Sequence, residues 1–265
     1  MCVRPSYSPV ILVRPTRFRH AFTLIEMLLV VSIISLLIAM LLPNLSKAKE
    51  SINRTVCQTR LNQLATAAVS YSNDHGRRLP TGVRGDGAEH LPWISADLFD
   101  ILQKYIGVAK PSSAYASGAA MPDAMLECPN FAMAGPGYYN PAAKGWVLGY
   151  LYLGGHPRVA AAPLSAGSIA WRSPIVTKDG SLPLWVDWNE WSPLDRWTVV
   201  PHTVNGARQD GGSYYNGSGG GARSSLMGAE GSNVAKVDGS VAWKPISQME
   251  QHETSLSIGN WLGMW

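Results

Sequence analysis

The stretch from Trp185 to Trp191 contains the side chains of this sequence that are best suited to binding a ligand, and three of them are tryptophans. Exposed tryptophans next to carboxylates can stack on sugar rings and hydrogen-bond to sugar hydroxyls. Alternation along a strand, however, places Trp185 and Asp187 opposite Val186 and Trp188, so some of these rings must face a core. We therefore favour core packing for the tryptophans and keep a glycan contact as the alternative.

The carboxylates of the same region could also bind a cation. Asp187, Glu190 and Asp195 offer oxygen ligands suited to calcium, although their spacing does not match an EF-hand loop. The histidines at positions 75, 90, 156, 202 and 252 are scattered and show no metal-ligand spacing. Calcium is therefore the one cofactor kept as a hypothesis.

No motif for catalysis stands out. Ser218 follows Asn216 and Gly217, so it lacks the first glycine of a G-x-S-x-G nucleophile elbow. The glycines at 217–221 do not follow the dinucleotide-binding pattern, and no phosphate-binding lysine comes after them. We interpret them as a surface loop and expect a protein that is not an enzyme.

The positive charge of the chain is concentrated at its start. Arg4, Arg14, Arg17 and Arg19 lie in the first 21 residues, where acidic residues are absent, and without them the 22 basic and 18 acidic residues balance. A basic nucleic-acid-binding surface on the rest of the chain is therefore not expected. With 46% apolar residues, the chain can bury a sizeable core.

An apolar run over 22–42 follows these arginines, with Glu26 as its one charged residue. The run is long enough to cross a bilayer as a helix, and the preceding arginines predict a cytoplasmic N-terminus and an exported remainder. A cleaved secretory signal is the competing interpretation, but the run is long and leads into Pro43 rather than a small-x-small cleavage site. A carboxylate in such a span is costly unless it lies near the interface or has a partner.

The sequence Ala21-Phe22-Thr23-Leu24-Ile25-Glu26 resembles the processing site of type IV prepilins and type II secretion pseudopilins. The resemblance implies that prepilin peptidase cuts between Ala21 and Phe22 and that the new amino terminus at Phe22 is methylated. Glu26 would then be the fifth mature residue and Pro43 the twenty-second, as in the family. The residue before the cut is usually glycine, and here it is Ala21. In the family, the acidic fifth residue meets the terminal ammonium of a neighbouring subunit, which implies that Glu26 is an assembly determinant.

Helical periodicity continues past the apolar run. Leu45, Ile52, Val56, Leu64, Ala68 and Tyr71 recur on one face at 3.6 residues per turn, and the pattern ends before Gly76. We predict one helix over 22–72, bent or loosened at Pro43, which removes a backbone hydrogen bond. The charged residues of the stem fall mostly on its other faces.

The remainder of the chain is rich in glycine, proline and tryptophan and predicts short strands at 145–153, 182–188, 197–200, 233–237 and 240–244, with a helix at 96–105. Asp238 and Gly239 lie between two alternating segments, which predicts a hairpin with a two-residue type I′ turn. The expected fold is α+β, a pilin-like lollipop with a long helix packed on an antiparallel sheet. We assign a leader to 1–21, the long helix to 22–76 and the globular domain to 77–265.

The hairpin carries a second resemblance, to pilin-like proteins of the Planctomycetes and Verrucomicrobia type. Those proteins end in a strand-Asp-Gly-strand with a histidine ten residues before the aspartate. Here that position is Gly228, and His202 is a displaced counterpart, with the loop 205–221 inserted.

Of the three cysteines, Cys57 lies on the stem and Cys128 in the body, both on the exported side in this topology. A disulfide between them would close a loop of about 70 residues and add roughly 4 kcal/mol in the chain-entropy model. Two separately buried thiols are the alternative. Cys2 belongs to the leader.

Together these patterns predict a pilin-like subunit of a type II secretion pseudopilus or a type IV pilus-like filament. Its expected location is the inner membrane, with a single pass and the body in the periplasm or outside the cell. Its partners would be prepilin peptidase, other pilin or pseudopilin subunits, the inner-membrane assembly platform and the lipid bilayer, without nucleic acid. The alternative is a membrane-anchored protein that binds a carbohydrate or another ligand and does not polymerise.

Overall fold

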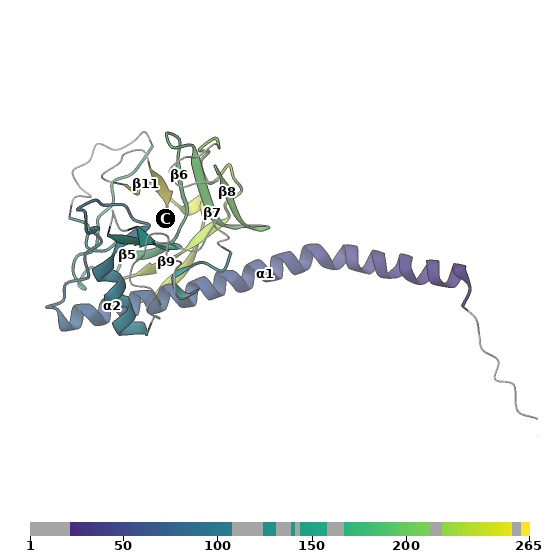
Figure 1. Cartoon of the computed structure of the whole chain (residues 1–265), viewed down its shortest axis with the longest axis horizontal. Coiled ribbons are helices and arrows are strands. Elements are labelled where there is room, and N and C mark those ends of the chain that lie inside the picture. The colour runs from purple at the N-terminus through teal and green to yellow at the C-terminus, as the bar shows by residue number, and fades with distance from the viewer. Residues whose placement is uncertain are drawn as a thin grey trace, which may run out of the picture. The chain divides into compact units, whose positions relative to one another are not determined.

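The computed structural model describes residues 22–107, 124–130, 139–140, 144–157, 167–211, 219–255 and 261–265. The chain divides into two compact units, Met1–Pro43 and Asn44–Trp265, which are described separately. The helix α1 (Leu24–Asp74) supplies residues to both units, as Figure 1 shows. The predicted long helix is therefore confirmed, with its start two residues later and its end two residues later than expected.

In the first unit, α1 begins with a reciprocal cap. The Glu26 backbone N–H donates to Thr23 Oγ1 at 3.2 Å, and the Thr23 N–H and hydroxyl each donate to Glu26 Oε2 at 2.8 Å. This arrangement satisfies two donors that the first turn of a helix otherwise leaves without a partner. Pro43 lies inside α1 at the end of this unit. The bend at Pro43 stays a prediction.

In the second unit, the buried face of α1 differs from the predicted one. Cys57, Leu61, Leu64 and Ala68 are fully buried and lie three or four residues apart, which places them on one face. Leu45 and Ile52, which belong to the predicted face, are 66% and 63% exposed. The periodicity thus located the helix correctly but extended its core-facing stripe too far toward the N-terminus, where the described residues leave the stem uncovered.

The described strands form three antiparallel sheets. The first has the order β1-β3-β2 and contains β1 (Trp93–Ser95), β2 (Tyr139–Asn140) and β3 (Gly145–Val147). The second has the order β10-β9-β5-β4 and contains β4 (Tyr150–Tyr152), β5 (Pro183–Asp187), β9 (Gly231–Lys236) and β10 (Val241–Pro245). The third has the order β11-β12-β6-β7-β8 and contains β6 (Glu190–Ser192), β7 (Trp197–Thr203), β8 (Gly206–Asp210), β11 (Gln251–Glu253) and β12 (Leu262–Met264).

Short helices lie between some of these strands. The helix α2 (Ala96–Ile106) begins after Ser95, whose hydroxyl accepts from the Leu98 N–H, and ends at Gly107 in the left-handed conformation. This element confirms the helix predicted at 96–105. Two 3₁₀ turns, η1 (Ala124–Leu126) and η2 (Ile246–Gln248), complete the described helices.

The hairpin between β9 and β10 is present, but its turn differs from the prediction. The Lys236 N–H donates to the Ser240 carbonyl and the Gly239 N–H to the Lys236 carbonyl, so the loop has three residues, 237–239. Gly239 has φ +84°, whereas Asp238 keeps a negative φ. The Asp238 carboxylate accepts from the Ser240 N–H at 2.8 Å, which holds this conformation. The two-residue type I′ turn is wrong because it requires positive φ at both central residues.

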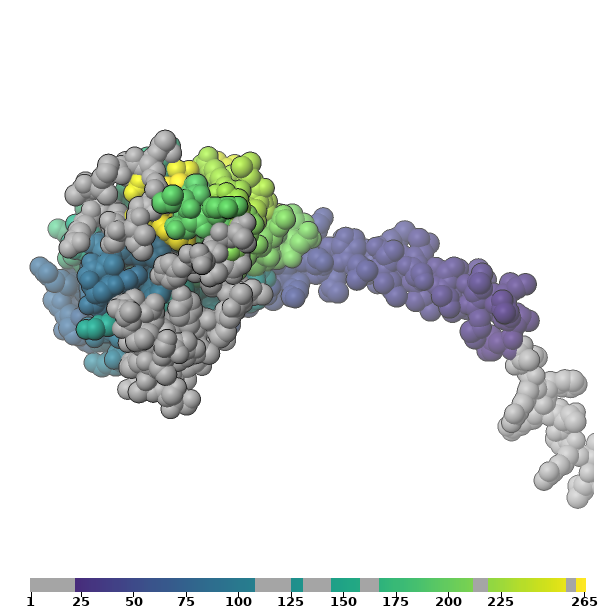
Figure 2. Space-filling model, turned by 45° about the horizontal axis from the view of Figure 1, so that its top comes forward, coloured from purple at the N-terminus to yellow at the C-terminus, as the bar shows by residue number. Residues whose placement is uncertain are grey.

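The described residues of the second unit form two apolar clusters. One joins α1 and α2 to the first and second sheets, and the other is rich in tryptophan and contains residues of all three sheets. Figure 1 shows β5 and β9 beside the C-terminal part of α1, with β6, β7, β8 and β11 beyond them. Figure 2 shows the later segments, in green and yellow, gathered on one part of the surface of this unit. The fold is α+β, as predicted.

Candidate functional site

The N-terminal residues that carry the predicted chemistry lie at the start of α1. Phe22 is 73% exposed, and the Glu26 carboxylate is bonded to Thr23. Ala21, the other half of the predicted cleavage site, lies outside the described residues. Because only one oxygen of Glu26 is used by Thr23 in these contacts, the carboxylate retains capacity to accept from a further cationic donor.

The helix that follows is apolar enough to cross a membrane. An 18-residue window within α1 has a mean hydropathy of 2.8, and none of that window is buried in the structure. The exposed side chains are mostly leucine, isoleucine, valine and methionine between positions 24 and 42. An unburied apolar helix of this length is suited to lipid rather than to water.

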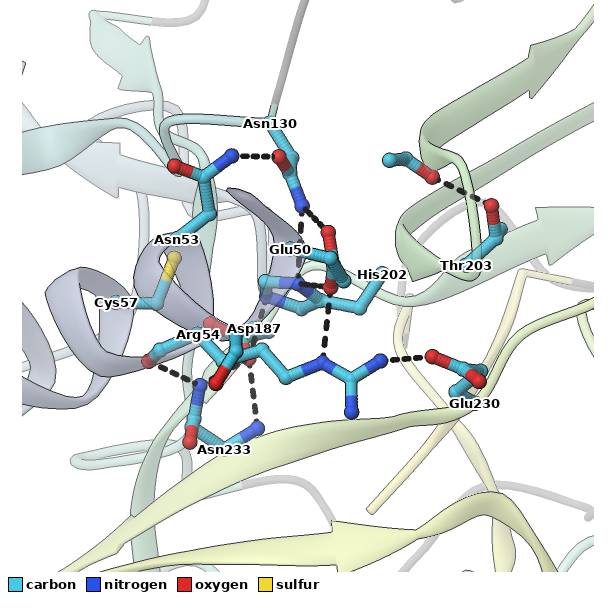
Figure 3. Close-up of polar contacts among 12 residues, drawn as sticks. Glu50, Asn53, Arg54, Cys57, Asn130, Asp187, His202, Thr203, Glu230 and Asn233 are labelled. Atoms are coloured by element: carbon cyan, nitrogen blue, oxygen red, sulfur yellow. Dashed lines mark hydrogen bonds and ion pairs between the residues drawn. The ribbon is translucent and has the colours of Figure 1, made fainter. Parts of the chain in front are cut away.

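A second group of polar residues lies where α1 meets the sheets, with four buried members and two, Arg54 and Asn130, that are half-buried. We call it the buried polar cluster: Glu50, Arg54, Asn130, Asp187, His202 and Asn233, drawn in Figure 3. His202 Nδ1 is 2.8 Å from Glu50 Oε1, and His202 Nε2 is 3.2 Å from Asp187 Oδ2. Burial alone lowers the pKa of His202, but the charge of Asp187 and hydrogen bonds to Asp187, Cys57 and Glu50 raise it to about 11. The imidazole ring is thus a buried cation between two carboxylates.

Glu50 is the contribution of α1 to this cluster and is 5% exposed. Arg54 Nε donates to Glu50 Oε1 at 2.9 Å, and Asn130 Nδ2 donates to Glu50 Oε2. Burial raises the pKa of Glu50, but the hydrogen bonds from His202 and Arg54 and the positive charge of His202 lower it below its ordinary value. Arg54 also pairs with Glu230 and lies 4.1 Å above the ring of Trp243.

Asp187, at the end of β5, is held by Asn233 of β9. Its Oδ2 accepts from the Asn233 backbone N–H at 2.6 Å and from Asn233 Nδ2 at 3.0 Å. Asn233 Nδ2 also donates to the Arg54 carbonyl of α1 at 3.2 Å. One side chain of β9 therefore connects the helix to the carboxylate of β5.

The two cysteines of the body lie beside this cluster. Cys57 on α1 and Cys128 after η1 are both buried, and their Sγ atoms are 3.0 Å apart as free thiols. Cys128 Sγ is 3.7 Å from His202 Nε2. Hydrogen bonding to Cys128 and burial raise the pKa of the Cys57 thiol well above its usual range. The structure brings the predicted pair together, and the disulfide itself stays a prediction.

The tryptophan stretch lies in the core. Trp185 and Trp188 are fully buried and Trp191 is 2% exposed, which agrees with the favoured packing interpretation and leaves none of these rings available to a sugar. Trp185 belongs to the cluster beside α1, whereas Trp188 belongs to the tryptophan-rich cluster. Burial raises the pKa of Glu190 to about 8, despite hydrogen bonds from Thr254 and Trp188.

The structure does not unite the carboxylates proposed for calcium. Asp187 faces His202, Glu190 accepts from Trp188 Nε1 at 2.6 Å, and Asp195 Oδ2 accepts from the Ser192 hydroxyl. Among the described residues, the group with the geometry to hold a metal ion is instead Cys57, Cys128 and His202. Gaps of 71 and 74 residues separate these three, so no spacing pattern in the sequence indicates them.

Sequence reasoning also missed Glu50 and Arg54, which the pattern placed on the polar side of the stem. Their i, i+4 spacing with the acidic residue first is the arrangement that forms an ion pair on a helix. That signal was present, but it did not reveal that the pair is covered by β7 and β9.

Comparison with known proteins finds an N-terminal motif and three similar competence proteins. A family model described as the prokaryotic N-terminal methylation motif matches residues 16–42. The competence protein ComGC of Halalkalibacterium halodurans is 36% identical over 70 residues, which cover 26% of this chain and 68% of that protein. The ComG operon protein 3 homolog of Bacillus licheniformis is 37% identical over 59 residues, 22% of this chain and 61% of the relative. ComGC of Bacillus subtilis is 33% identical over 60 residues, which cover 23% of this chain and 61% of that protein.

The chain thus spans about three fifths to two thirds of the length of these relatives. About three quarters of this chain lies outside each of these matches. No solved structure matches the chain.

Proposed function

Since the chain belongs to the family of pilin-like proteins that includes ComGC and carries the prokaryotic N-terminal methylation motif, we propose that it is a building block of an extracytoplasmic filament. The observation that carries the proposal is the position of Glu26, five residues beyond the proposed cut and within the matched motif. The apolar part of α1 supports membrane storage of the subunit before assembly.

Processing comes first in this proposal. Prepilin peptidase cleaves between Ala21 and Phe22, and the amino group of Phe22 is then methylated. The exposed Phe22 and the helix that starts two residues later support a cut in this short segment. Removal of the arginine-rich leader creates a positively charged amino terminus next to an apolar helix.

Assembly depends on that amine and on Glu26. A carboxylate and an ammonium group that are each costly in hydrocarbon become tolerable as a pair. In a stored monomer, Thr23 supplies hydrogen bonds to the same carboxylate. An incoming subunit would add the ammonium of its own Phe22, and this pairing sets the axial register between subunits.

The topology follows from the same segment. Residues 22–42 span the inner membrane once, with the leader in the cytoplasm and the domain 77–265 in the periplasm or outside the cell. The inner-membrane assembly platform and other pilin or pseudopilin subunits are the proposed partners. The protein is structural and not an enzyme.

Two kinds of filament fit these features, a type II secretion pseudopilus and a type IV pilus-like filament. The relatives are named as competence proteins, which favours a type IV pilus-like filament over a secretion pseudopilus. Their matches cover only about a quarter of this chain, so the cargo depends on the body. The competing hypothesis, an anchored carbohydrate-binding protein, loses support because the tryptophans proposed to bind sugar are buried.

Replacement of Glu26 by Ala tests the proposal. We expect normal insertion into the membrane and normal cleavage after Ala21, measured by fractionation and by the intact mass of the mature chain, but no sheared or cross-linked filament. Thr23→Ala is the matched control, because it removes the two cap contacts of the Thr23 hydroxyl and keeps the carboxylate. Filaments of normal amount from Glu26→Ala, or a mature protein that keeps its leader, would contradict the proposal.

A further inference from the structure

Two thiols and an imidazole from three distant parts of the chain converge in the interior of the second unit. The Sγ atoms of Cys57 and Cys128 and a ring nitrogen of His202 all lie within 4.8 Å of one another. All three residues are at most 2% exposed. We propose that these three side chains form a zinc site beside Asp187, with one oxygen ligand completing the coordination, and this proposal does not depend on the filament proposal.

Three distances between pairs of ligand atoms can be compared with those of a tetrahedrally coordinated ion, and two of them agree. With metal–ligand bonds of about 2.3 Å to sulfur and about 2.0–2.2 Å to nitrogen and oxygen, a tetrahedron has edges of about 3.6 Å for sulfur–nitrogen and about 3.4 Å for nitrogen–oxygen. Cys128 Sγ lies 3.7 Å from His202 Nε2, and that nitrogen lies 3.2 Å from Asp187 Oδ2. The sulfur–sulfur edge would be about 3.8 Å, so the thiols, now 3.0 Å apart, must separate by less than an ångström on binding.

The neighbouring residues orient the ligands as in known metal sites. Glu50 Oε1 faces His202 Nδ1 at 2.8 Å (Figure 3), which leaves Nε2 beside Asp187 Oδ2 and Cys128 Sγ. A carboxylate on the far nitrogen of a metal-bound histidine is a common supporting contact. Glu50 is itself fixed by Arg54.

Asp187 provides a second, independent observation. Its Oδ2 is held by Asn233, but its Oδ1 is buried and has no hydrogen-bond partner among the described residues. A buried carboxylate oxygen without a partner is costly. A cation bound next to this carboxylate would compensate for part of that cost.

The donor set selects the metal. Thiolate and imidazole ligands suit zinc, whereas calcium and magnesium prefer oxygen ligands throughout. Binding would replace the protons of both thiols and the Nε2 proton of His202, which leave to solvent. The two resulting thiolates and the charges of Asp187 and Glu50 together favour a divalent over a monovalent ion. The class of ligand is therefore a borderline-soft divalent cation, and zinc fits it best.

A cavity lies next to the residues that support the site. It has a volume of about 380 Å³ and is lined by Glu50, Asn130, Lys49 and Gly206, among others. Glu50 and Asn130 both contact His202, so these two side chains lie between the cavity and the imidazole ring.

The predicted disulfide is the competing state of the same sulfurs. Oxidation removes one hydrogen from each thiol and leaves no thiolate for the ion, so the two states exclude each other. A disulfide is favoured in oxidising compartments, and the experiment must therefore establish the redox state of the cysteines.

The test uses the full chain in detergent, reduced with a phosphine and freed of metal. We expect one zinc per chain by native mass spectrometry, and an X-ray absorption spectrum with two sulfur, one nitrogen and one oxygen neighbours. Cys57→Ser and Cys128→Ser should weaken zinc binding at least 100-fold in competition with a chromophoric chelator. Glu50→Gln should weaken it about 10- to 100-fold, and Cys2→Ser should not change it.

The spectrum of the wild-type protein keeps the proposal testable if a cysteine variant does not fold. No zinc on fully reduced wild-type protein would overturn the proposal, as would a spectrum without sulfur neighbours or equal affinity in the Cys57→Ser variant. Protein that is isolated as the disulfide and does not bind zinc after reduction would also overturn it.

Discussion

Replacement of Glu50 by Gln removes one of the two carboxylates that balance the buried His202 cation while keeping the size of the side chain. The amide still fits the space between Arg54 and Asn130, so little packing is lost. The imidazolium ring would keep Asp187 as its one acidic neighbour at hydrogen-bond distance. The cost should therefore be mainly electrostatic.

The magnitude follows from burial. Breaking one side of a buried ion pair costs about 3–5 kcal/mol, because the remaining charge stays desolvated. The matched control is Glu230→Gln, which removes a second carboxylate from the same Arg54. Glu230 is 36% exposed against 5% for Glu50, so its pair is largely screened and should contribute about 1 kcal/mol or less.

Urea unfolding of the metal-free full chain in detergent micelles measures both variants. All ten tryptophans lie beyond residue 92, so their fluorescence reports on the second unit. With a slope of about 3 kcal/mol per M, Glu50→Gln should lower the midpoint by about 1–1.7 M and Glu230→Gln by about 0.3 M or less. The measurement should be made at pH 6. At this pH, Glu50, with its lowered pKa, and His202, with its raised pKa, are both charged in the folded protein and contribute to the free energy of unfolding. Equal losses in the two variants would refute the assignment of a buried ionic centre.

Two further predictions concern the sheets and the turns. Burial raises the pKa of Glu190 from 4.5 to about 8, so the contribution of its neutral form to stability is complete below pH 4.5 and is lost as the pH rises to about 8. Glu190→Gln should flatten this decline of the free energy of unfolding with pH, measured by urea titrations at a series of pH values. An unchanged slope would contradict the assignment. Gly155 has φ +66°, and a Cβ atom there would lie 2.3 Å from the Pro80 carbonyl oxygen, whereas Gly239 has φ +84° and open space. Gly239→Ala should cost about 1–2 kcal/mol from backbone strain alone and Gly155→Ala clearly more, so equal shifts in thermal melting would count against the close contact.

Local patterns predicted the elements of this fold well. The apolar run and the stem periodicity are signals carried by neighbouring residues, and α1 appears where these signals place it. The helix α2 likewise appears where a helix was predicted, at 96–105. The β9–β10 hairpin was also predictable, but its turn type was not, since the outcome depends on how Asp238 bonds to Ser240.

The buried polar cluster could not be predicted, because its members meet only through sheet pairing. His202 on β7 reaches Glu50 across 152 residues of sequence, and Asn233 reaches Asp187 across 46. Nothing in the sequence around Glu50 distinguishes a covered glutamate from a solvated one. The burial of the Trp185–Trp191 stretch was more accessible, because strand alternation already required inward-facing rings.

The place of β12 in the five-stranded sheet has a consequence for how the body is made. This strand pairs with β11 on one side and with β6 on the other, so residues 262–264 are needed to join strands that were synthesised earlier. The sheet therefore stays divided until the segment that contains Trp261 and Trp265, both at most 4% exposed, has been synthesised. Deletion of residues 261–265 should leave β11 detached from β6.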